Sequence, residues 1–366
     1  MERRQFISGA TAGSATAMIS GFPAPAIAQG KTEWRMVTTW PKNLPGPGAA
    51  AEQFARSIGE ATGGRLTIQV YAAGELVPAF EAFDAVQRGV AEVLHASTYF
   101  WQGKSQAMAF FATVPFGMTS TELAAWMRYG GGQELWNELY ERFGLKGFHS
   151  GNTGVQMGGW FNKEINSLED VKGLKIRMPG LGGEMMRRLG ATVVNLPASE
   201  ILPALQSGAI DATEWIGPFA DLGLGLHRSA KYYYWPGVHE PGNAGEITVS
   251  KPQFDELADD VRRIFETVVL AEHHRLAAEF LARNAESLDV LVRQHGVRLR
   301  RFPDEVLQGM GNAAGEVIAE LRDTGDDLTR KIADSFIEHR RSLMTWTDIG
   351  ELAFMQARNL PFKYAS

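Results

Sequence analysis

Strand-like and helix-like segments alternate along this chain, and the alternation starts twice. In the first set, a helical apolar pattern over residues 46–62 separates strand patterns at residues 34–39 and 66–71. A strand, a helix and a strand with short connections form a βαβ unit, which favours a parallel sheet. A second set runs from residue 146 to residue 215. We therefore predict an α/β protein of two lobes with a cleft between them.

The last third of the chain has the apolar spacing of helices. This pattern continues from residue 252 to about residue 294, several times the length of an ordinary globular helix. A helix of that length either spans both lobes or breaks once. Further helices are predicted from residues 303 and 328, and a last one from about residue 343. The last helix is unusually apolar for a terminal tail, which docking on another subunit or packing on its own domain would explain.

Length and composition exclude several classes of protein. With 366 residues, the chain is long enough for two domains. The formal net charge is -6, and no basic block or aromatic–basic stripe appears, which argues against a nucleic-acid partner. The chain has no cysteine, which excludes disulfides, a thiol nucleophile and thiolate metal sites.

The N-terminus has the layout of a cleaved export signal. Arg3 and Arg4 precede a weakly apolar run of small residues, which ends in the sequence Ala-Ile-Ala at residues 26–28. This layout matches a secretory signal, and the arginine pair fits the twin-arginine type. We predict a signal peptide over residues 1–28 and an exported mature protein. A membrane anchor is the alternative, but the run is shorter than the roughly 20 apolar residues that a span needs.

Motifs for catalysis do not stand out. The eight histidines lack metalloenzyme spacing, because His273 and His274 are adjacent, His239 lies near the candidate site region, and the other five are isolated. We interpret them as core or surface residues. The glycines at residues 130–132 lack the lysine and the preceding strand of a phosphate loop, and they indicate a helix break. No serine-nucleophile or dinucleotide-binding motif is recognisable.

Three segments each bring one polar group to a predicted strand end, and they are residues 152–160, 173–180 and 210–215. Ligands of open α/β sheets bind outside the carboxyl ends of the strands, so these groups suit a small anion. Arg177 ends an apolar strand, and its planar guanidinium can bind a carboxylate through two donors. An internal salt bridge with an Asp or Glu is the alternative use of Arg177.

Two glutamates and an aromatic residue complete the candidate site. Glu214 lies in the predicted strand over residues 210–215, and Glu240 follows at a Pro-Gly turn. Two carboxylates in one cleft repel each other, and a cation with the amide oxygen of Gln156 as a further hard ligand would relieve the repulsion. The alternative is two unrelated surface glutamates. Tyr99 follows another strand end, where it either contacts a ligand or is buried for packing.

Several segments carry a family resemblance, namely residues 74–78, 84–89, 170–177 and 205–212. Through them the mature chain resembles the periplasmic solute-binding subunits of TRAP (tripartite ATP-independent periplasmic) transporters, the DctP-type family. Two longer motifs, at residues 152–160 and 211–218, look like the branch that binds 2-oxo or 2-hydroxy monocarboxylates through a bound metal.

The resemblance implies a two-lobed, periplasmic-binding-protein-like α/β fold in which each lobe is a mixed sheet flanked by helices. Lobe I would comprise residues 29–150 and about 245–275, and lobe II residues 151–244 and about 276–340. The long helix would span both lobes. Residues 341–366 would form an extra C-terminal helix, through which members of this branch tend to form homodimers.

The resemblance also implies roles for the candidate metal ligands. Gln156, Glu214, the backbone carbonyl of Trp215, and Glu240 would surround a metal ion that also touches the substrate. Two carboxylates, one guanidinium and a monocarboxylate ligand leave two negative charges, which Ca²⁺ would neutralise and Na⁺ would only halve. The resemblance admits either ion, and the charge argument favours Ca²⁺.

For the substrate, the resemblance implies that Arg177 grips the carboxylate and that Tyr99 closes the site from lobe I. Asn152, Gln156 and Trp215 would be further substrate contacts. The predicted function is a periplasmic receptor, not an enzyme, that binds pyruvate, lactate or a longer homologue and delivers it to the membrane subunits of a TRAP permease. A metal-assisted enzyme acting on small oxo acids is the alternative, and its general base would have to be one of the two glutamates.

Overall fold

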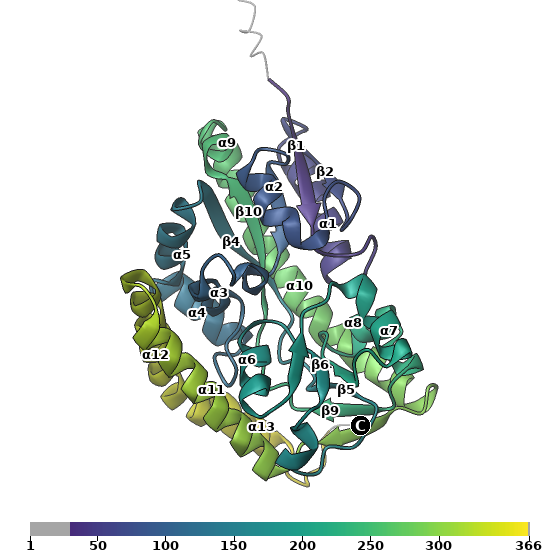
Figure 1. The fold of residues 1–366 in the computed structure, drawn as a ribbon. Helices are drawn as coiled ribbons and strands as arrows, with labels where there is room; N and C mark the ends of the chain where they lie inside the picture. Colours follow the sequence, from purple (N-terminus) through teal and green to yellow (C-terminus); the bar gives the residue numbers. More distant parts are fainter. Residues whose placement is uncertain (1–29, 365–366) are drawn as a thin grey trace, which may run out of the picture. The chain divides into compact units, whose positions relative to one another are not determined.

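The computed structural model describes residues 30–364, and the first sheet within that range is five-stranded (Figure 1). β1 (Thr32–Thr38) pairs in parallel with β2 (Leu66–Tyr71) and β3 (Val93–Ala96), as the predicted βαβ unit requires. β10 (Ala244–Ser250) runs antiparallel to β3 and to β4 (Leu145–Asn152), so that the sheet is mixed. The predicted signal peptide, residues 1–28, lies outside the described residues. In spatial order the strands are β2, β1, β3, β10 and β4.

The second sheet within the described range is six-stranded and also mixed. In spatial order its strands are β11 (Arg298–Arg301), β9 (Tyr232–Trp235), β5 (Gly159–Phe161), β8 (Ala212–Thr213), β6 (Lys175–Arg177) and β7 (Thr192–Val194). β8 is shorter than the strand predicted over residues 210–215, so Glu214 follows the strand instead of lying in it. The chain leaves the sheet here because the carboxylate of Asp221 accepts hydrogen bonds from the backbone N–H groups of Ile216 and Gly217.

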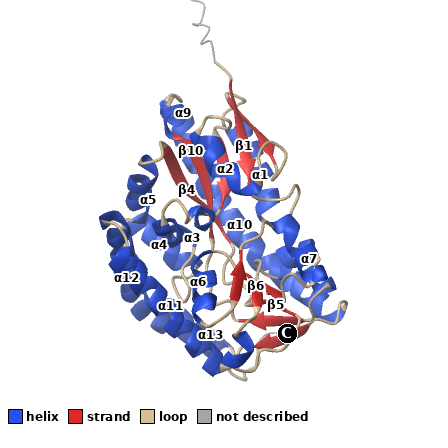
Figure 2. Ribbon diagram, in the orientation of Figure 1, coloured by secondary structure: helices blue, strands red, loops and turns tan. Residues whose placement is uncertain are grey.

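Helices flank both sheets (Figure 2). The helix break predicted at the glycines is confirmed, because α4 ends at Tyr129 and α5 begins at Gly132. Gly131 between them has a φ of 82°, a left-handed conformation that glycine adopts without strain. The helices up to the second sheet's last crossover are α1 (Pro47–Ala61), α2 (Ala82–Gln87), α3 (Ala109–Ala112), α4 (Ser120–Tyr129), α5 (Gly132–Glu141), α6 (Gly180–Arg188), α7 (Ala198–Ser207) and α8 (Pro218–Leu224).

The long helix predicted over residues 252 to about 294 breaks once, which is one of the two outcomes that the sequence allowed. A short helix, α9 (Lys251–Asp255), precedes α10 (Asp259–Arg293). α10 packs on α1, β4 and α8. Its buried side chains divide between two clusters, since Phe265 belongs to a core cluster with Trp34 and Phe280 to one with Trp215. α10 therefore serves the hydrophobic cores beside both sheets.

The second of the C-terminal helices is longer than predicted. α11 (Asp304–Thr324) is followed by α12 (Asp327–Thr347), whose N-terminus is capped by the Asp326 carboxylate. The separate helix predicted from about residue 343 is wrong in its start, because no glycine or proline interrupts α12 there. The chain continues through a π-helical turn at Asp348–Leu352 into α13 (Ala353–Arg358). Among the residues described, no helix is both long and apolar enough to cross a bilayer.

Candidate functional site

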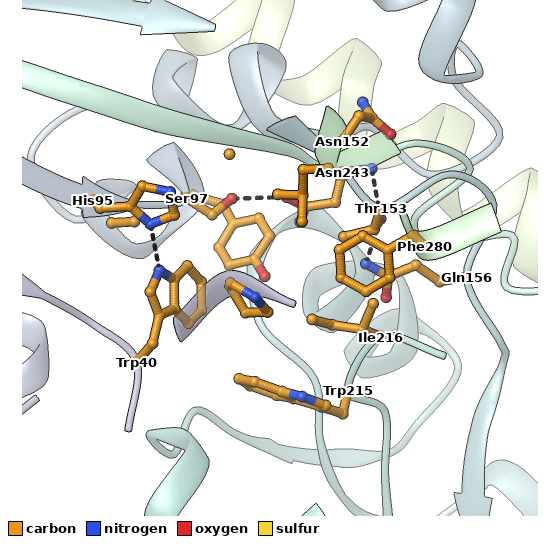
Figure 3. Close-up of a pocket in the computed structure, with 15 residues that line it drawn as sticks. Trp40, His95, Ser97, Asn152, Thr153, Gln156, Trp215, Ile216, Asn243 and Phe280 are labelled. Carbon is orange, nitrogen blue, oxygen red and sulfur yellow. Dashed lines mark hydrogen bonds between the residues drawn. The ribbon is translucent and has the colours of Figure 1, made fainter. Parts of the chain in front are cut away.

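A small cavity lies where strand ends of the two sheets meet α10 (Figure 3). The centre of a water-sized molecule has about 30 Å³ to occupy. A ligand that fits this conformation must therefore be small. The predicted residues Tyr99, Asn152, Gln156 and Trp215 all line the cavity. Arg177, Glu214 and Glu240 are not part of its lining but are connected to residues that are.

One wall of the cavity is apolar. Trp40, Trp215, Leu276 and Phe280 contribute to it, and the rings of Trp40 and Trp215 pack edge to face with centroids 6.2 Å apart. His95 lies beside Trp40, whose indole N–H donates to Nδ1 of His95 at 2.7 Å. Burial lowers the pKa of His95 to about 4, so the imidazole is neutral at physiological pH. This wall therefore carries no charge toward a ligand.

Arg177 and Glu214 form a buried ion pair beneath the cavity. β6 and β8 are parallel neighbours with Arg177 opposite Thr213, which places the next residue, Glu214, beside the guanidinium. Nη1 of Arg177 donates to Oε1 of Glu214, and the two side chains are only 1% and 0% exposed. Nε of Arg177 donates to the carbonyl of Leu196 at 3.2 Å. The internal salt bridge that the sequence left open is thus present, and the other arm of the guanidinium is not used by it.

Glu240 is held by neutral donors. Its Oε2 accepts hydrogen bonds from the side-chain amides of Gln156 at 2.7 Å and Asn243 at 2.6 Å. Burial, followed by the charge of Glu214, raises the pKa of Glu240 well above its usual range. The two glutamates predicted to share a cleft do lie together, since one oxygen of each falls within 4.8 Å of the other and of a nitrogen of His239. The reading of them as unrelated surface residues is therefore wrong.

Tyr99 lies in a short 3₁₀ helix that follows β3, at Thr98–Trp101. Its side chain is buried and packs edge to face on Phe100, with ring centroids 4.7 Å apart. Burial raises the pKa of Tyr99 well above its usual value, and the charges of Glu240 and Glu214 add to the effect. The hydroxyl therefore stays protonated beside the carboxylates, where it can donate a hydrogen bond.

Four buried polar atoms in and under the cavity have no hydrogen-bond partner within residues 30–364. They are Nδ2 of Asn152, Oε1 of Gln156, Nη2 of Arg177 and Nε1 of Trp215. Buried polar groups in folded proteins are almost always paired, so each unpaired group calls for an explanation. Three of the four are N–H donors and one is an amide oxygen. The set is complementary to a ligand that carries oxygen acceptors together with a cation.

The residues present fit a hard cation. Carboxylates and amide oxygens are the ligands that Ca²⁺ prefers, and Glu214, Glu240 and Gln156 supply both kinds of group. Oε1 of Gln156 is the clearest sign, because its partner nitrogen donates to Glu240 while the oxygen itself has no partner among the described residues.

The motifs missed four residues that the structure brings to the site. His239 lies beside Glu214, and Asn243 bonds to Glu240. Ser97 bonds to the side-chain oxygen of Asn243, and Trp40 lines the cavity. The sequence placed His239 near the site region but led to its interpretation as a core or surface residue, and it is indeed buried. The only signal in the sequence that could have found it is its position next to Glu240, because loop residues show no periodicity.

Comparison with known proteins gives a consistent family. Residues 36–324 match the family model DctP, described as bacterial extracellular solute-binding protein, family 7. The monocarboxylate 2-oxoacid-binding periplasmic protein of Nostoc sp. is 40% identical over 321 residues, which cover 88% of this chain and 87% of that protein.

Solved structures are similar over nearly the whole chain. A TRAP periplasmic solute-binding protein of Pseudoalteromonas atlantica, with bound sodium and pyruvate, has a TM-score of 0.86 at 38% identity, covering 89% of this chain and 99% of that one. A counterpart from Colwellia psychrerythraea, with calcium and pyruvate, has a TM-score of 0.86 at 37% identity and the same coverage. A Bordetella bronchiseptica protein, a mixed-occupancy dimer with calcium and picolinate, has a TM-score of 0.87 at 33% identity, covering 90% and 97%.

Proposed function

Since the chain belongs to family 7 of the bacterial extracellular solute-binding proteins, the DctP family, we propose that it is a periplasmic TRAP receptor for a small 2-oxo or 2-hydroxy monocarboxylate bound with a Ca²⁺ or Na⁺ ion. Proteins of this family are receptors of transporters and not enzymes, and they work with TRAP membrane permeases. The receptor reading therefore replaces the alternative of a metal-assisted enzyme.

The four unpaired buried polar atoms carry this proposal. A carboxylate would take the free Nη2 of Arg177, and the N–H groups of Asn152 and Trp215 are further donors for ligand oxygens. An oxygen on the second carbon, oxo or hydroxy, gives a second acceptor beside the first. The neutral, apolar wall formed by Trp40 and Phe280 accepts the remaining alkyl group and offers nothing to a second carboxylate.

The cation would be held by Glu214, Glu240, Oε1 of Gln156 and, as the resemblance implies, the carbonyl of Trp215. It supplies positive charge that lets two carboxylates and an anionic ligand be buried together. Burial and, after it, the charge of Glu214 raise the pKa of Glu240, and such an ion would offset both effects. Tyr99, from the 3₁₀ helix after β3, would donate a hydrogen bond from its hydroxyl to the ligand.

Thermal unfolding of metal-stripped protein tests the proposal. Pyruvate, lactate and longer 2-oxo acids are added with Ca²⁺, with Na⁺ or with neither, and acetate, which lacks the second oxygen, is the matched control. A ligand that binds only the folded state adds about 2.7 kcal/mol of stability at a hundredfold excess over Kd. We expect a large shift that needs both acid and cation. A shift with acid alone would remove the cation from the proposal, and conversion of the acid would contradict a receptor.

We also propose that the protein forms a homodimer through its last helix. Apolar side chains beyond residue 345 are widely exposed, with Trp346 at 68%, Ile349 at 69% and Phe354 at 61%. Such a patch is typical of a surface that another chain covers, and a second copy is the partner that the resemblance implies. Phe354→Lys should give a monomer in light scattering after gel filtration. Leu281→Lys is the control, because it replaces an exposed apolar side chain on α10, outside the C-terminal patch, and should leave the protein dimeric.

We also propose that the two predicted lobes move relative to each other when the ligand binds. Lobe I would hold Tyr99, and lobe II would hold Arg177 and the two glutamates, so that ligand binding requires both. The crossing segments are β4 into residues 153–158, residues 236–243 before β10, and α10. We propose that these act as the hinge for closure. Small-angle scattering with and without pyruvate and Ca²⁺ should show a smaller radius of gyration when both are present.

A further inference from the structure

His239 lies against the oxygen of Glu214 that Arg177 leaves free. Nε2 of His239 is 3.3 Å from Oε2 of Glu214, while Arg177 bonds to Oε1. Both side chains are buried, at 2% and 0% exposure. Because a carboxylate oxygen can only accept, the ring nitrogen must be the donor. Glu214 is therefore fixed at both oxygens, by a guanidinium on one side and an imidazole on the other.

Gly182, in the neighbouring helix α6, leaves room for the side chain of His239. A Cβ built on Gly182, in α6, would lie 3.0 Å from Cβ of His239 and 3.1 Å from the sulfur of Met178. Glycine in a helix interior is intrinsically unfavourable, so its presence here needs a local reason. The close approach of the loop that carries His239 supplies that reason. The backbone of the same loop is held by Phe116, whose N–H donates to the carbonyl of Val238 at 2.7 Å.

We infer that His239 is a positioning residue that orients the Glu214 carboxylate for the cation, without itself contacting substrate. This inference rests on the proposed function and goes beyond it by adding a residue that none of the motifs or relatives assigns. A carboxylate bonded only at Oε1 can rotate about its last side-chain bond and turn Oε2 away from Glu240. The N–H of His239 prevents that rotation and leaves a second lone pair of Oε2 free for the ion.

Residues that hydrogen-bond to a metal ligand matter because a metal site gains affinity when its ligands are already oriented. Removing one typically costs about 10- to 100-fold in metal affinity.

The test compares two substitutions at one position. His239→Leu removes the donor, and His239→Gln keeps an N–H at a similar distance from the backbone. We expect the Leu variant to lose about 10- to 100-fold in Ca²⁺ affinity, and the Gln variant to recover most of it. Affinity is measured by calorimetric titration of metal-free protein with CaCl₂ alone, and then by titration with pyruvate at saturating Ca²⁺. His149→Gln, a buried histidine outside the cavity lining, is the control that should bind as the wild type does.

A second variant displaces His239 without touching any polar group. Gly182→Ala should displace Cβ of His239, and with it the side chain, by a few tenths of an ångström, and should lower Ca²⁺ affinity by less than His239→Leu does. Gly59→Ala is its control, because that glycine is also inside a helix, α1, and an added Cβ there meets nothing within 4 Å. The melting temperature of each metal-free variant shows that the fold is intact.

Three results would overturn the inference. Unchanged Ca²⁺ affinity in both His239→Leu and Gly182→Ala would show that Glu214 needs no orienting partner. Equal losses in the Leu and Gln variants would show that the donor is not what matters. Loss of Zn²⁺ binding in the Gln variant with Ca²⁺ binding retained would show that His239 contacts the ion directly. If the wild type itself binds neither ion nor acid, the proposed function fails instead, so the two failures are distinguishable.

Discussion

Two buried groups of carboxylates in this protein differ in how completely their hydrogen bonds are made. Glu246, on β10, accepts from Trp101 at 2.6 Å, from Tyr140 at 2.9 Å and from Thr248 at 2.6 Å. Burial raises the pKa of Glu246 to about 7, yet neither Glu246 nor these three partners keeps an unpaired buried side-chain atom. Around Glu214 and Glu240, by contrast, Arg177 and Gln156 each keep such an atom.

The difference separates a structural carboxylate from a binding one. Both groups are buried and both raise a glutamate pKa, so neither burial nor pKa identifies the site. Polar networks that are fully satisfied rigidify a core, whereas unsatisfied ones cost free energy that something else must offset. In the proposed receptor, that offset comes from the ligand and the cation. The unpaired atoms are therefore a better guide to function here than the titration of the carboxylates.

The largest expected effect breaks the Arg177–Glu214 pair. Arg177→Ala leaves Glu214 buried without its cationic partner, and losing one partner of a buried pair typically costs about 3–5 kcal/mol of folding free energy. We also expect pyruvate to give no thermal shift in this variant, with or without Ca²⁺. Urea unfolding gives the first quantity, and the thermal assay gives the second.

A double variant separates these two effects. Arg177→Met with Glu214→Leu replaces both charges by apolar groups of similar size, which is often neutral for stability. Stability should therefore return while binding stays absent. Recovery of pyruvate binding in the double variant would mean that neither side chain belongs to the site.

The second expected effect concerns Glu246, whose hydrogen bonds are all made, and it is measured as the change of folding stability with pH. The folded-state pKa of Glu246, about 7, lies above its ordinary value of 4.5, so the folded protein binds the proton more tightly than the unfolded chain. The stability that this provides is fully present below pH 4.5 and is lost as the pH rises through 7. At about 1.4 kcal/mol per pKa unit, a difference of about 2.5 units corresponds to a total loss of roughly 3.5 kcal/mol. Urea unfolding of metal-free protein from pH 5 to pH 8 measures it.

Glu246→Gln removes this titration and should flatten the decline in stability over the same range. An amide can still accept from Trp101, and the hydroxyls of Tyr140 and Thr248 can turn to suit it. Asp221, whose pKa burial raises to about 6, contributes a decline of the same sign at lower pH and should persist in the variant. An unchanged slope would show that Glu246 is already ionised in the folded protein. Pyruvate binding should be the same in both proteins.

How far the sequence could predict the site depends on which interactions are local. The 3.6-residue and two-residue periods predicted α1 and β2 closely, because each is fixed by the burial of one face. Arg177 and Glu214 could be picked out as charged residues at strand ends, but their pairing depends on β6 and β8 being neighbours. No spacing along the chain encodes that, since the two residues are 37 positions apart.

The loop of residues 236–243 was the least predictable part of the site. It has no periodicity, and its shape follows from long-range bonds such as the one from the N–H of Gly237 to the carbonyl of Gln156 at 2.9 Å. His239 and Asn243 gain their partners only through that packing. The continuation of α12 past residue 343 was missed for the opposite reason: an exposed apolar face gives a helical period but does not mark where the helix starts.

The smallest expected effect concerns Ser97, which lies next to the group of side chains with unpaired polar atoms. The hydroxyl of Ser97 bonds to Oδ1 of Asn243 at 3.1 Å, and Asn243 in turn bonds to Glu240. Ser97→Ala removes one hydrogen bond from a neutral pair, which is worth about 0.5–1.5 kcal/mol of stability. Because Asn243 keeps its bond to Glu240, pyruvate affinity should fall only slightly, and urea unfolding with calorimetry measures both changes. If affinity instead fell as far as in Arg177→Ala, the orientation of Asn243 would belong to the ligand site, and the border between the paired and the unpaired groups would lie one residue further out.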